Sequence, residues 1–318
     1  MSELLLDLYK KMYLIRVAEA EIIREYHHDE MRTPMHMSLG EEAICAGVCR
    51  ALPPGSHGYG TYRSHGLYLA WTGETDKFFA ELYGKATGTA GGKAGSMHLT
   101  SPEHGLMATS AVVGTTIPLA VGDALESKYS NANRIAAVFF GDGATDEGVF
   151  WESLNMACLF KLPVLFVCED NGLAIHIPKE RRRGYVSLPR IIQNFKCNVF
   201  DSDGWDVEKV YSLATQAIDL ILNEGVPSVL NLRYYRYLEH VGINQDLEAN
   251  YRPEGEYLEW QNKDTVKSLL KKLIEKGLKK EVVAMEREIR SQVKLSRIKA
   301  QKDSFPSSDN IMKGVYCE

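Results

Sequence analysis

The sequence predicts an α/β protein in which helices cover both faces of a doubly wound, mostly parallel sheet. Short apolar runs of strand length alternate with amphipathic helical segments through the middle of the chain. Two of these runs, 135–140 and 162–168, flank a helical segment at about 147–160, which is the order of a βαβ unit. No repeat or flexible linker divides the 318 residues, so we expect a single domain over 1–318.

Both ends of the chain are predicted to be helical extensions of this domain. Residues 4–26 place apolar side chains at helical spacing, with charged side chains between them. Residues 256–318 form a tail rich in lysine and glutamate, in which periodic Leu, Ile and Val predict one or two exposed helices. The remaining segments continue the alternation, with helices at 41–51, 117–129 and 207–222 and strands at 195–200 and 228–232.

Composition excludes several classes of function. The net charge is −5 and no basic face is indicated, so we expect no nucleic-acid partner. The first residues lack the basic start of a signal peptide, and no apolar run approaches the roughly 20 residues of a membrane span. The six cysteines lie in apolar or unpatterned contexts, which indicates reduced thiols, no zinc site and a cytoplasmic location.

A group of polar residues follows the two central apolar runs. The first run ends at Gly141-Asp142-Gly143, and the second ends at Asp170 and Asn171. Ligands bind at the carboxyl ends of strands in open parallel sheets, and glycine lets the backbone approach a phosphate. Asp142 and Asn171 carry the oxygen ligands that Mg²⁺ prefers. The pattern therefore predicts a metal–diphosphate site, although polar, glycine-rich turns of an ordinary βαβ unit would read the same way.

Several other loops carry unusual chemistry. Tyr62-Arg63-Ser64-His65-Gly66 packs aromatic, basic and imidazole groups among glycines, either as a phosphate contact or as plain surface. Five of the fifteen residues in 84–98 are glycine, which indicates a flexible loop or one that follows a ligand closely. Basic and aromatic residues also cluster at 233–240, after a strand. The run 179–184 is interpreted as solvated surface because it is highly charged.

Taken together, these motifs resemble one family. Gly141-Asp142-Gly143, followed after 27 residues by Asn171, is similar to the signature of thiamin-diphosphate enzymes. The sequence around this signature resembles the alpha subunit of two-chain 2-oxo acid dehydrogenases and acetoin dehydrogenases over about residues 5–255. The matching segments are Leu39-Gly40-Glu41-Glu42-Ala43, Tyr62 to Gly66, Tyr83-Gly84-Lys85-Ala86-Thr87-Gly88, Gly95-Ser96-Met97-His98, Ile117-Pro118-Leu119-Ala120, Asn155-Met156-Ala157 and Lys161-Leu162-Pro163.

The resemblance implies ligands for both the metal and the cofactor's diphosphate. The side chains of Asp142 and Asn171 and the carbonyl of Leu173 are expected to coordinate Mg²⁺, and diphosphate and water oxygens to complete its octahedron. The groups implied to reach the diphosphate of thiamin diphosphate are Tyr62, Arg63, His240 and the backbone N–H groups of Gly143 and Ala144.

The same resemblance implies groups nearer the reacting end. Main-chain contacts of Ala111 and Val113 are expected to hold the aminopyrimidine ring, and Arg236 to order the loop that carries His240. His36 and His65 are expected to join His240 as catalytic residues. Of these two, we expect His65 to be the one that orients the substrate or moves protons.

Four positions carry a residue that differs from the one usual in the family. Asp170 stands where asparagine is usual, and an ionised carboxylate there would weaken diphosphate binding unless it points away or pairs with a cation. Ala111 replaces a glycine, and Leu173 replaces an aromatic residue but is needed only for its carbonyl. Val241 follows His240 without a hydroxyl group, so the phosphorylation control of some relatives is not expected.

The resemblance also implies a partner chain. In the family, a glutamate that activates the aminopyrimidine belongs to a separate beta subunit, so we expect an α2β2 heterotetramer that is inactive without it. The implied reaction oxidatively decarboxylates a 2-oxo acid, or cleaves acetoin, and passes the acyl group to a lipoyl acyltransferase. Two alternatives remain: a transketolase-like carboligase without a lipoyl partner, and a scaffold without activity.

Overall fold

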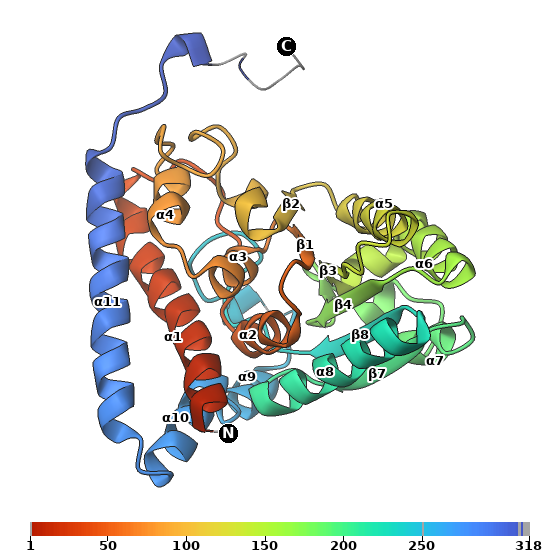
Figure 1. Cartoon of the computed structure of the whole chain (residues 1–318). Helices are drawn as coiled ribbons and strands as arrows, with labels where there is room; N and C mark the ends of the chain where they lie inside the picture. Colours follow the sequence, from red (N-terminus) through yellow and green to blue (C-terminus); the bar gives the residue numbers. More distant parts are fainter. Residues whose placement is uncertain (1, 250, 311–312, 314–318) are drawn as a thin grey trace.

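The centre of the molecule is a six-stranded parallel sheet, seen in a computed structural model that describes residues 2–249, 251–310 and 313 (Figure 1). The strand order is β2-β1-β3-β4-β8-β7, and every neighbouring pair is parallel. The predicted sheet class is confirmed. The strands are β1 (His57–Thr61), β2 (Leu106–Ser110), β3 (Ala136–Gly141), β4 (Val164–Asp170), β7 (Asn198–Asp203) and β8 (Ser228–Arg233).

Helices cover both faces of the sheet, as predicted. Strands β3 and β4 are apolar along their length because both of their faces are buried. Phe139 and Val167 belong to the core under one helical layer, whereas Phe140 and Phe166 belong to the core under the other. The first layer holds α2 (Glu42–Ala51), α3 (His65–Thr72) and α8 (Val207–Glu224), and the second holds α5 (Thr116–Tyr129), α6 (Gly148–Phe160) and α7 (Leu188–Ile192).

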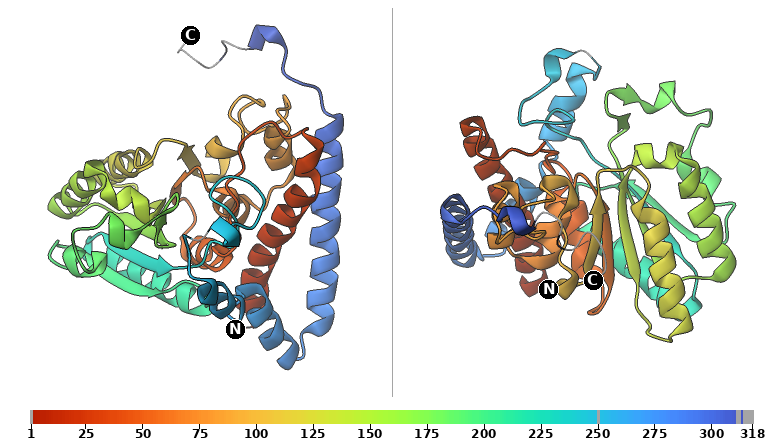
Figure 2. Two further views of the ribbon diagram at one scale, coloured as in Figure 1. Left: turned by 180° about the vertical axis from the view of Figure 1, so that it is seen from behind. Right: turned by 90° about the horizontal axis from the view of Figure 1, so that it is seen from above.

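The two terminal regions pack together outside the first layer. Helix α1 (Ser2–Glu25) runs alongside α11 (Lys279–Lys302) in both views of the ribbon (Figures 1 and 2). A third apolar cluster and ion pairs join them, among them Arg297 Nε to Glu21 Oε1 at 2.9 Å. None of the helices in the described residues is long and apolar enough to cross a membrane.

The C-terminal tail holds three helices rather than one or two. They are α9 (Glu254–Gln261), α10 (Thr265–Glu275) and α11. The break before α10 is made by Asp264, whose side chain accepts a hydrogen bond from the N–H of Lys267 and caps the new helix. Gly277, at φ +80°, then follows its end. The part of the predicted tail at 311–312 and 314–318 lies outside the described residues.

Strands β1 and β2 and the short helices α3 and α4 (Asp76–Leu82) were not predicted. The sequence of β1, His-Gly-Tyr-Gly-Thr, lacks the β-branched run that marks a strand. Its glycines have a packing reason: a Cβ at Gly58 would lie 2.8 Å from the Trp71 ring, and one at Gly60 would lie 2.6 Å from Leu67. Close contact with α3 therefore requires glycine at both positions.

Candidate active site

The site lies at the carboxyl edge of the sheet, where the strand order reverses. Strand β1 pairs with β2 on one side and with β3 on the other, so a crevice opens between the loops that follow β1 and β3. A cavity of about 200 Å³ occupies this edge. Its lining includes most of the predicted site residues: Tyr62, Arg63, Val113, Gly143, Ala144, Asn171, Leu173, Arg236 and His240.

Asp142 and Asn171 stand at the ends of adjacent strands. Asp142 is fully buried at the start of a 3₁₀ turn, and its Oδ1 has no hydrogen-bond partner. The Asn171 amide is fixed, because its Nδ2 donates to Tyr234 Oη at 3.0 Å and its Oδ1 accepts from the N–H of Leu173 at 3.0 Å. An unpartnered carboxylate oxygen beside an amide oxygen fits a small hard cation.

Arg63 lies in the loop that follows β1, at the carboxyl end of this strand. Its Nη1 donates to the carbonyl of Met37 at 2.7 Å, and its Nη2 donates to the carbonyl of His240 at 3.1 Å. Both bonds go to neutral acceptors, so the buried guanidinium keeps its full positive charge available to an anion. This placement agrees with the predicted diphosphate contact.

Arg236 ties the loop after β8 to the rest of the site. The side chain is almost completely buried. Its Nε donates to Leu238 O at 3.0 Å, its Nη1 to Ile175 O at 3.0 Å and its Nη2 to Tyr251 Oη at 2.6 Å. Burial lowers the pKa of Arg236 to about 10, and the nearby Arg63 acts in the same direction. Arg236 therefore fixes both sides of the loop that carries His240.

His36, Tyr62 and His240 form one aromatic cluster. The ring centroids of His36 and Tyr62 are 4.5 Å apart, and those of His36 and His240 are 5.3 Å apart. Burial, followed by the charge of Arg63, lowers the pKa of His36 and of His240 to about 3. Both imidazoles are thus neutral near pH 7, and each can donate one hydrogen bond to a ligand and accept another from it.

Neither His36 nor His65 lines the cavity. His36 packs against Tyr62 and His240, which do line it, whereas His65 lies deeper. It is completely buried, its Nδ1 is 3.1 Å from Glu19 Oε1, and its ring meets Phe78 edge-on at 5.3 Å. Burial lowers the pKa of His65 to about 3 and raises that of Glu19 to about 8. The geometry therefore favours His36 over His65 as the group that meets a substrate, and the catalytic role of His65 stays a prediction.

Two predicted ring contacts lie in the loop after β2. Val113 is half-exposed and lines the cavity, and Ala111 lies two residues earlier in the same loop. The loop is braced internally, since Thr115 Oγ1 donates to the carbonyl of Val112 at 2.8 Å. Residues 111–113 thus present a short, fixed stretch of backbone at the rim of the site.

Two buried glutamates line the cavity without having been predicted. Glu41 precedes α2, and Glu169 belongs to β4. Burial raises the pKa of Glu41 to about 8 and raises that of Glu169 well above its usual value, so both carboxyls are neutral near pH 7. They therefore do not repel an anion from Arg63. Acids are common at the start of helices, so the sequence around Glu41 carries no signal of its burial.

Asp170, the residue that departs from the family text, is turned toward the backbone. Its Oδ1 accepts a hydrogen bond from the N–H of Gly172 at 2.9 Å, and the side chain is buried. The same carboxylate contributes to the environment of Asp142: burial raises the pKa of Asp142 to about 7, and Asp170 adds to the increase.

The interpretation of 179–184 as solvated surface is wrong for two of its arginines. The side chains of Arg182 and Arg183 are only 10% and 7% exposed, and both form ion pairs with Asp142. A two-stranded hairpin, β5 (Leu173–Ala174) with β6 (Ile177–Pro178), turns the chain back over the 3₁₀ turn and brings them there. A run of like charges gives no indication of this, because the acids that it meets are 36 to 41 residues away.

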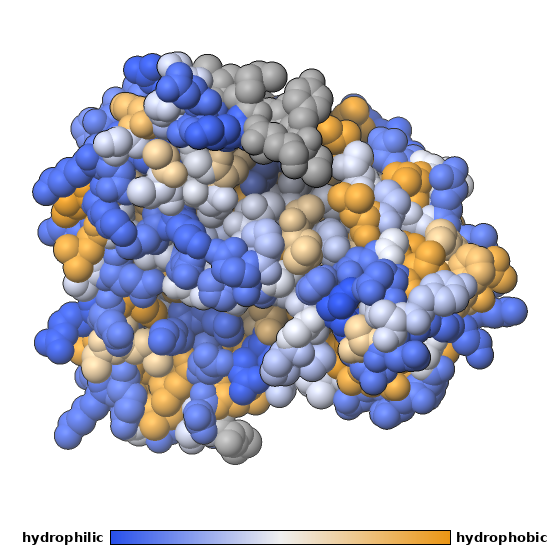
Figure 3. All heavy atoms as spheres, turned by 45° about the horizontal axis from the view of Figure 1, so that its top comes forward, coloured by the Kyte–Doolittle hydropathy of each residue, from blue (hydrophilic) through white to orange (hydrophobic). Residues whose placement is uncertain are grey.

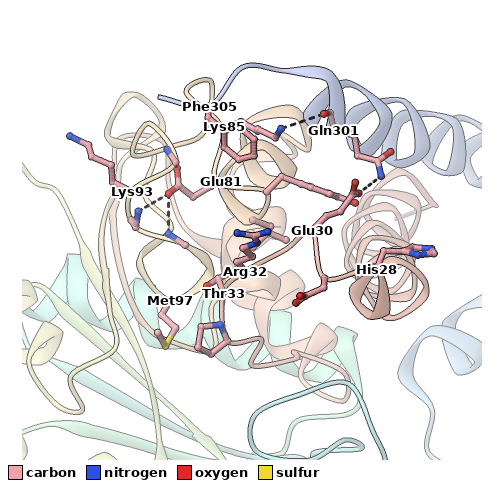
Figure 4. A pocket seen from close by; sticks show the side chains of 18 residues that line it. His28, Glu30, Arg32, Thr33, Glu81, Lys85, Lys93, Met97, Gln301 and Phe305 are labelled. Carbon is pink, nitrogen blue, oxygen red and sulfur yellow. Dashed lines mark hydrogen bonds between the residues drawn. The ribbon is translucent and has the colours of Figure 1, made fainter. Parts of the chain in front are cut away.

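The glycine-rich loop at 84–98 is ordered by one buried acid. Glu81 accepts hydrogen bonds from the backbone N–H groups of Ala90, Gly92, Ala94 and Gly95, at 2.8–3.0 Å (Figure 4). The loop borders a larger cavity, about 920 Å³, whose lining also includes Arg32 and Lys85. No residue at the carboxyl ends of β3 and β4 lines that cavity, whereas the smaller cavity is lined by Asn171 and by Gly141 and Gly143 on either side of the buried Asp142, so the smaller cavity is the candidate active site.

The sequence of this chain is similar to those of known enzyme subunits. A family model described as "Dehydrogenase E1 component" matches residues 10–308. The pyruvate dehydrogenase E1 component subunit alpha of Zymomonas mobilis is 35% identical over 99% of this chain and 90% of its own length. The alpha subunit of acetoin:2,6-dichlorophenolindophenol oxidoreductase of Bacillus subtilis is 30% identical over 99% of this chain and 94% of its own.

Proposed function

Because this chain belongs to the dehydrogenase E1 component family, we propose that it is the alpha subunit of a thiamin-diphosphate-dependent enzyme acting on a 2-oxo acid or acetoin. The names of its relatives support both substrate classes. The observation that carries the proposal is a cavity at the strand ends lined by Arg63, the fixed Asn171 amide and the two glycines that flank Asp142, whose buried carboxylate has an unpartnered oxygen.

The metal and the diphosphate are assigned to separate groups of residues. Asp142 Oδ1, the Asn171 carboxamide oxygen and the Leu173 carbonyl would hold Mg²⁺, whose preference is for such oxygens. The diphosphate would be bound by Tyr62, Arg63, His240 and the N–H groups of Gly143 and Ala144. When bound, thiamin diphosphate supplies a carbon nucleophile and accepts the electrons released as carbon dioxide leaves.

The chain's own contribution to chemistry is to orient the substrate and move protons. His36 and His240 are neutral and adjacent, so either ring can hydrogen-bond a substrate oxygen, or relay a proton by accepting it at one ring nitrogen while donating from the other. The buried Arg63 supplies a fixed positive charge beside His240. We assign His36 as the principal proton-transfer group of this chain.

The site is proposed to be completed by a beta subunit. The cavity of about 200 Å³ is smaller than the roughly 300–1,000 Å³ of a complete small-molecule site. Ile175 lines this cavity, and Val112 directly precedes Val113, which also lines it. Val112 and Ile175 expose 63% and 56% of their surface, respectively. The relatives' names, which specify an alpha subunit, support an α2β2 assembly in which the beta chain brings the activating glutamate. A lipoyl acyltransferase is the proposed acceptor, and the cysteine pattern supports a cytoplasmic location.

Calorimetric titration of the chain with its beta partner tests the cofactor assignment. Thiamin diphosphate should bind in the presence of Mg²⁺ and bind far more weakly when the metal is chelated. An Asp142→Asn variant should lose this metal dependence together with most of the affinity, because it removes the charged metal ligand. Equal binding by the wild type with and without metal would refute the assignment.

A further inference from the structure

Arg182 and Arg183 both contact Asp142 at the buried side of the site. Arg183 Nη2 is 3.2 Å from Asp142 Oδ2, 3.1 Å from the carbonyl of Asp142 and 3.5 Å from Thr145 Oγ1. Arg182 binds the same Oδ2 with one nitrogen and Asp146 with the other. Neither arginine lines the cavity at the strand ends, whereas Arg183 lines a separate hollow on the outer side.

The two oxygens of Asp142 are therefore not equivalent. Oδ2 is held by both guanidinium groups, and Oδ1 has no hydrogen-bond partner although the side chain is completely buried. A planar guanidinium that contacts both the carboxylate and the neighbouring carbonyl resists rotation of the carboxylate plane. This arrangement leaves one defined oxygen for a cation.

The arginines also balance local charge. Asp142, Asp146 and Asp170 place three carboxylates close together, and Asp170 is the one that a member of this family usually lacks. Two neighbouring cations offset much of their repulsion. The extra acid and the arginine pair thus occur together in this chain.

We propose that Arg182 and Arg183 are positioning residues for the metal: they hold Asp142 by Oδ2 so that Oδ1 is presented to the cation. The inference rests on the proposed function, since it requires Asp142 to be a metal ligand. Through these two arginines, the charged segment after the β5–β6 hairpin contributes to cofactor binding. Groups that orient a metal ligand in this way commonly change metal affinity by roughly 10–100-fold when they are removed.

Mn²⁺ binding, measured by electron paramagnetic resonance, tests the proposal. The complex with the beta partner is titrated with Mn²⁺ at saturating thiamin diphosphate, as wild type, Arg182→Gln and Arg183→Gln. Each variant should weaken Mn²⁺ binding by roughly 10-fold or more. Arg183→Lys, which keeps the charge without the planar fork, should recover part of the loss.

Arg181→Gln is the matched control, because Arg181 is exposed and the substitution removes the same charge from the same segment. It should leave Mn²⁺ affinity unchanged. Unchanged or tighter binding in Arg183→Gln, or an equal loss in Arg181→Gln, would overturn the positioning role. If Arg183→Gln does not fold, the titration of Arg182→Gln decides the outcome. A wild-type complex that binds neither Mn²⁺ nor thiamin diphosphate would refute the proposed function itself.

Discussion

Burial controls the charge of single residues around the site more strongly than sequence does. His36 and His240 are held neutral by desolvation and by Arg63, and Glu41 is held neutral by desolvation, with Glu19 adding to the effect and Arg63 opposing it. The guanidinium of Arg63, with the cationic Arg236 nearby, therefore stands beside neutral imidazoles and a neutral carboxyl group. Such an environment strengthens its attraction for an anion, because fewer opposing charges and little water screen it.

At His36, the structure makes a prediction that separates it from His65. His36→Gln should lower kcat by roughly 10²-fold, as expected when a proton-transfer group is removed, with little change in thiamin-diphosphate affinity. His65→Gln should lower kcat less, because His36 packs against the cavity-lining residues Tyr62 and His240, whereas the fully buried His65 packs against Phe78. Steady-state rates and cofactor titrations of the two variants check this. A greater loss of kcat in His65→Gln would restore the order expected from sequence.

At Glu19, stability should depend on pH. The folded-state pKa of about 8 lies above the ordinary 4.5, so the stabilising contribution is complete below pH 4.5 and is lost as pH rises toward 8. Each unit in that window costs the wild type at most about 1.4 kcal/mol from this group. Glu19→Gln keeps an oxygen for the N–H of Ser38 and should remove this slope. Urea midpoints at pH 5.5 and 8 should lie closer together in the variant than in the wild type, and the remaining difference comes from groups such as Glu41, whose pKa is also raised to about 8. A pH dependence equal to that of the wild type would contradict the expectation.

The site could be predicted from sequence where one residue type performs one known task at a strand end. Asp142 and Asn171 were found in this way. Arg63 follows β1, which was not predicted, and its role came from the family resemblance. The structure brings all three residues to one edge of the sheet. Arg182 and Glu41 were missed because their function depends on burial. A charged side chain in a loop, or at a helix start, has the same local sequence whether it is buried or exposed.

At the scale of elements, strands β3, β4, β7 and β8 were predictable, and β1 and β2 were not. The continuous apolar runs of β3 and β4 indicate burial on both faces. Strands β1 and β2, in contrast, are short and contain glycine, polar or small residues. Their strand conformation is imposed by neighbours: β1 pairs with β3, and its glycines admit Trp71 and Leu67. Tertiary packing there overrides local preference.

The glycine-rich loop gives a prediction at the same scale. Glu81→Gln leaves one side-chain oxygen and replaces the other acceptor with a donor, so two of the four backbone N–H groups lose their partner. Stability should fall by roughly 2–4 kcal/mol, and amide exchange at 90–95 should accelerate. Hydrogen exchange with mass spectrometry checks this, with Glu74→Gln as a control outside the loop. Unchanged protection of the loop would show that Glu81 does not order it.

At the scale of the whole molecule, the chain supplies a cofactor anchor rather than a complete catalyst. Its charged and polar surface is interrupted by apolar patches (Figure 3), and apolar side chains such as Val186, 98% exposed, are left without cover in this chain. The residues assigned to the metal and the diphosphate lie on one edge of one sheet. The group that activates the other end of the cofactor is assigned to the beta subunit.

The most direct measurement of this account is the rate of 2-oxo acid or acetoin oxidation with an artificial electron acceptor. The chain, its beta partner and their mixture are assayed separately with thiamin diphosphate and Mg²⁺. Activity should appear only in the mixture and should be lost when the alpha chain carries Asp142→Asn. Turnover by the chain alone at the rate of the mixture, or full activity with Asp142→Asn, would contradict the account.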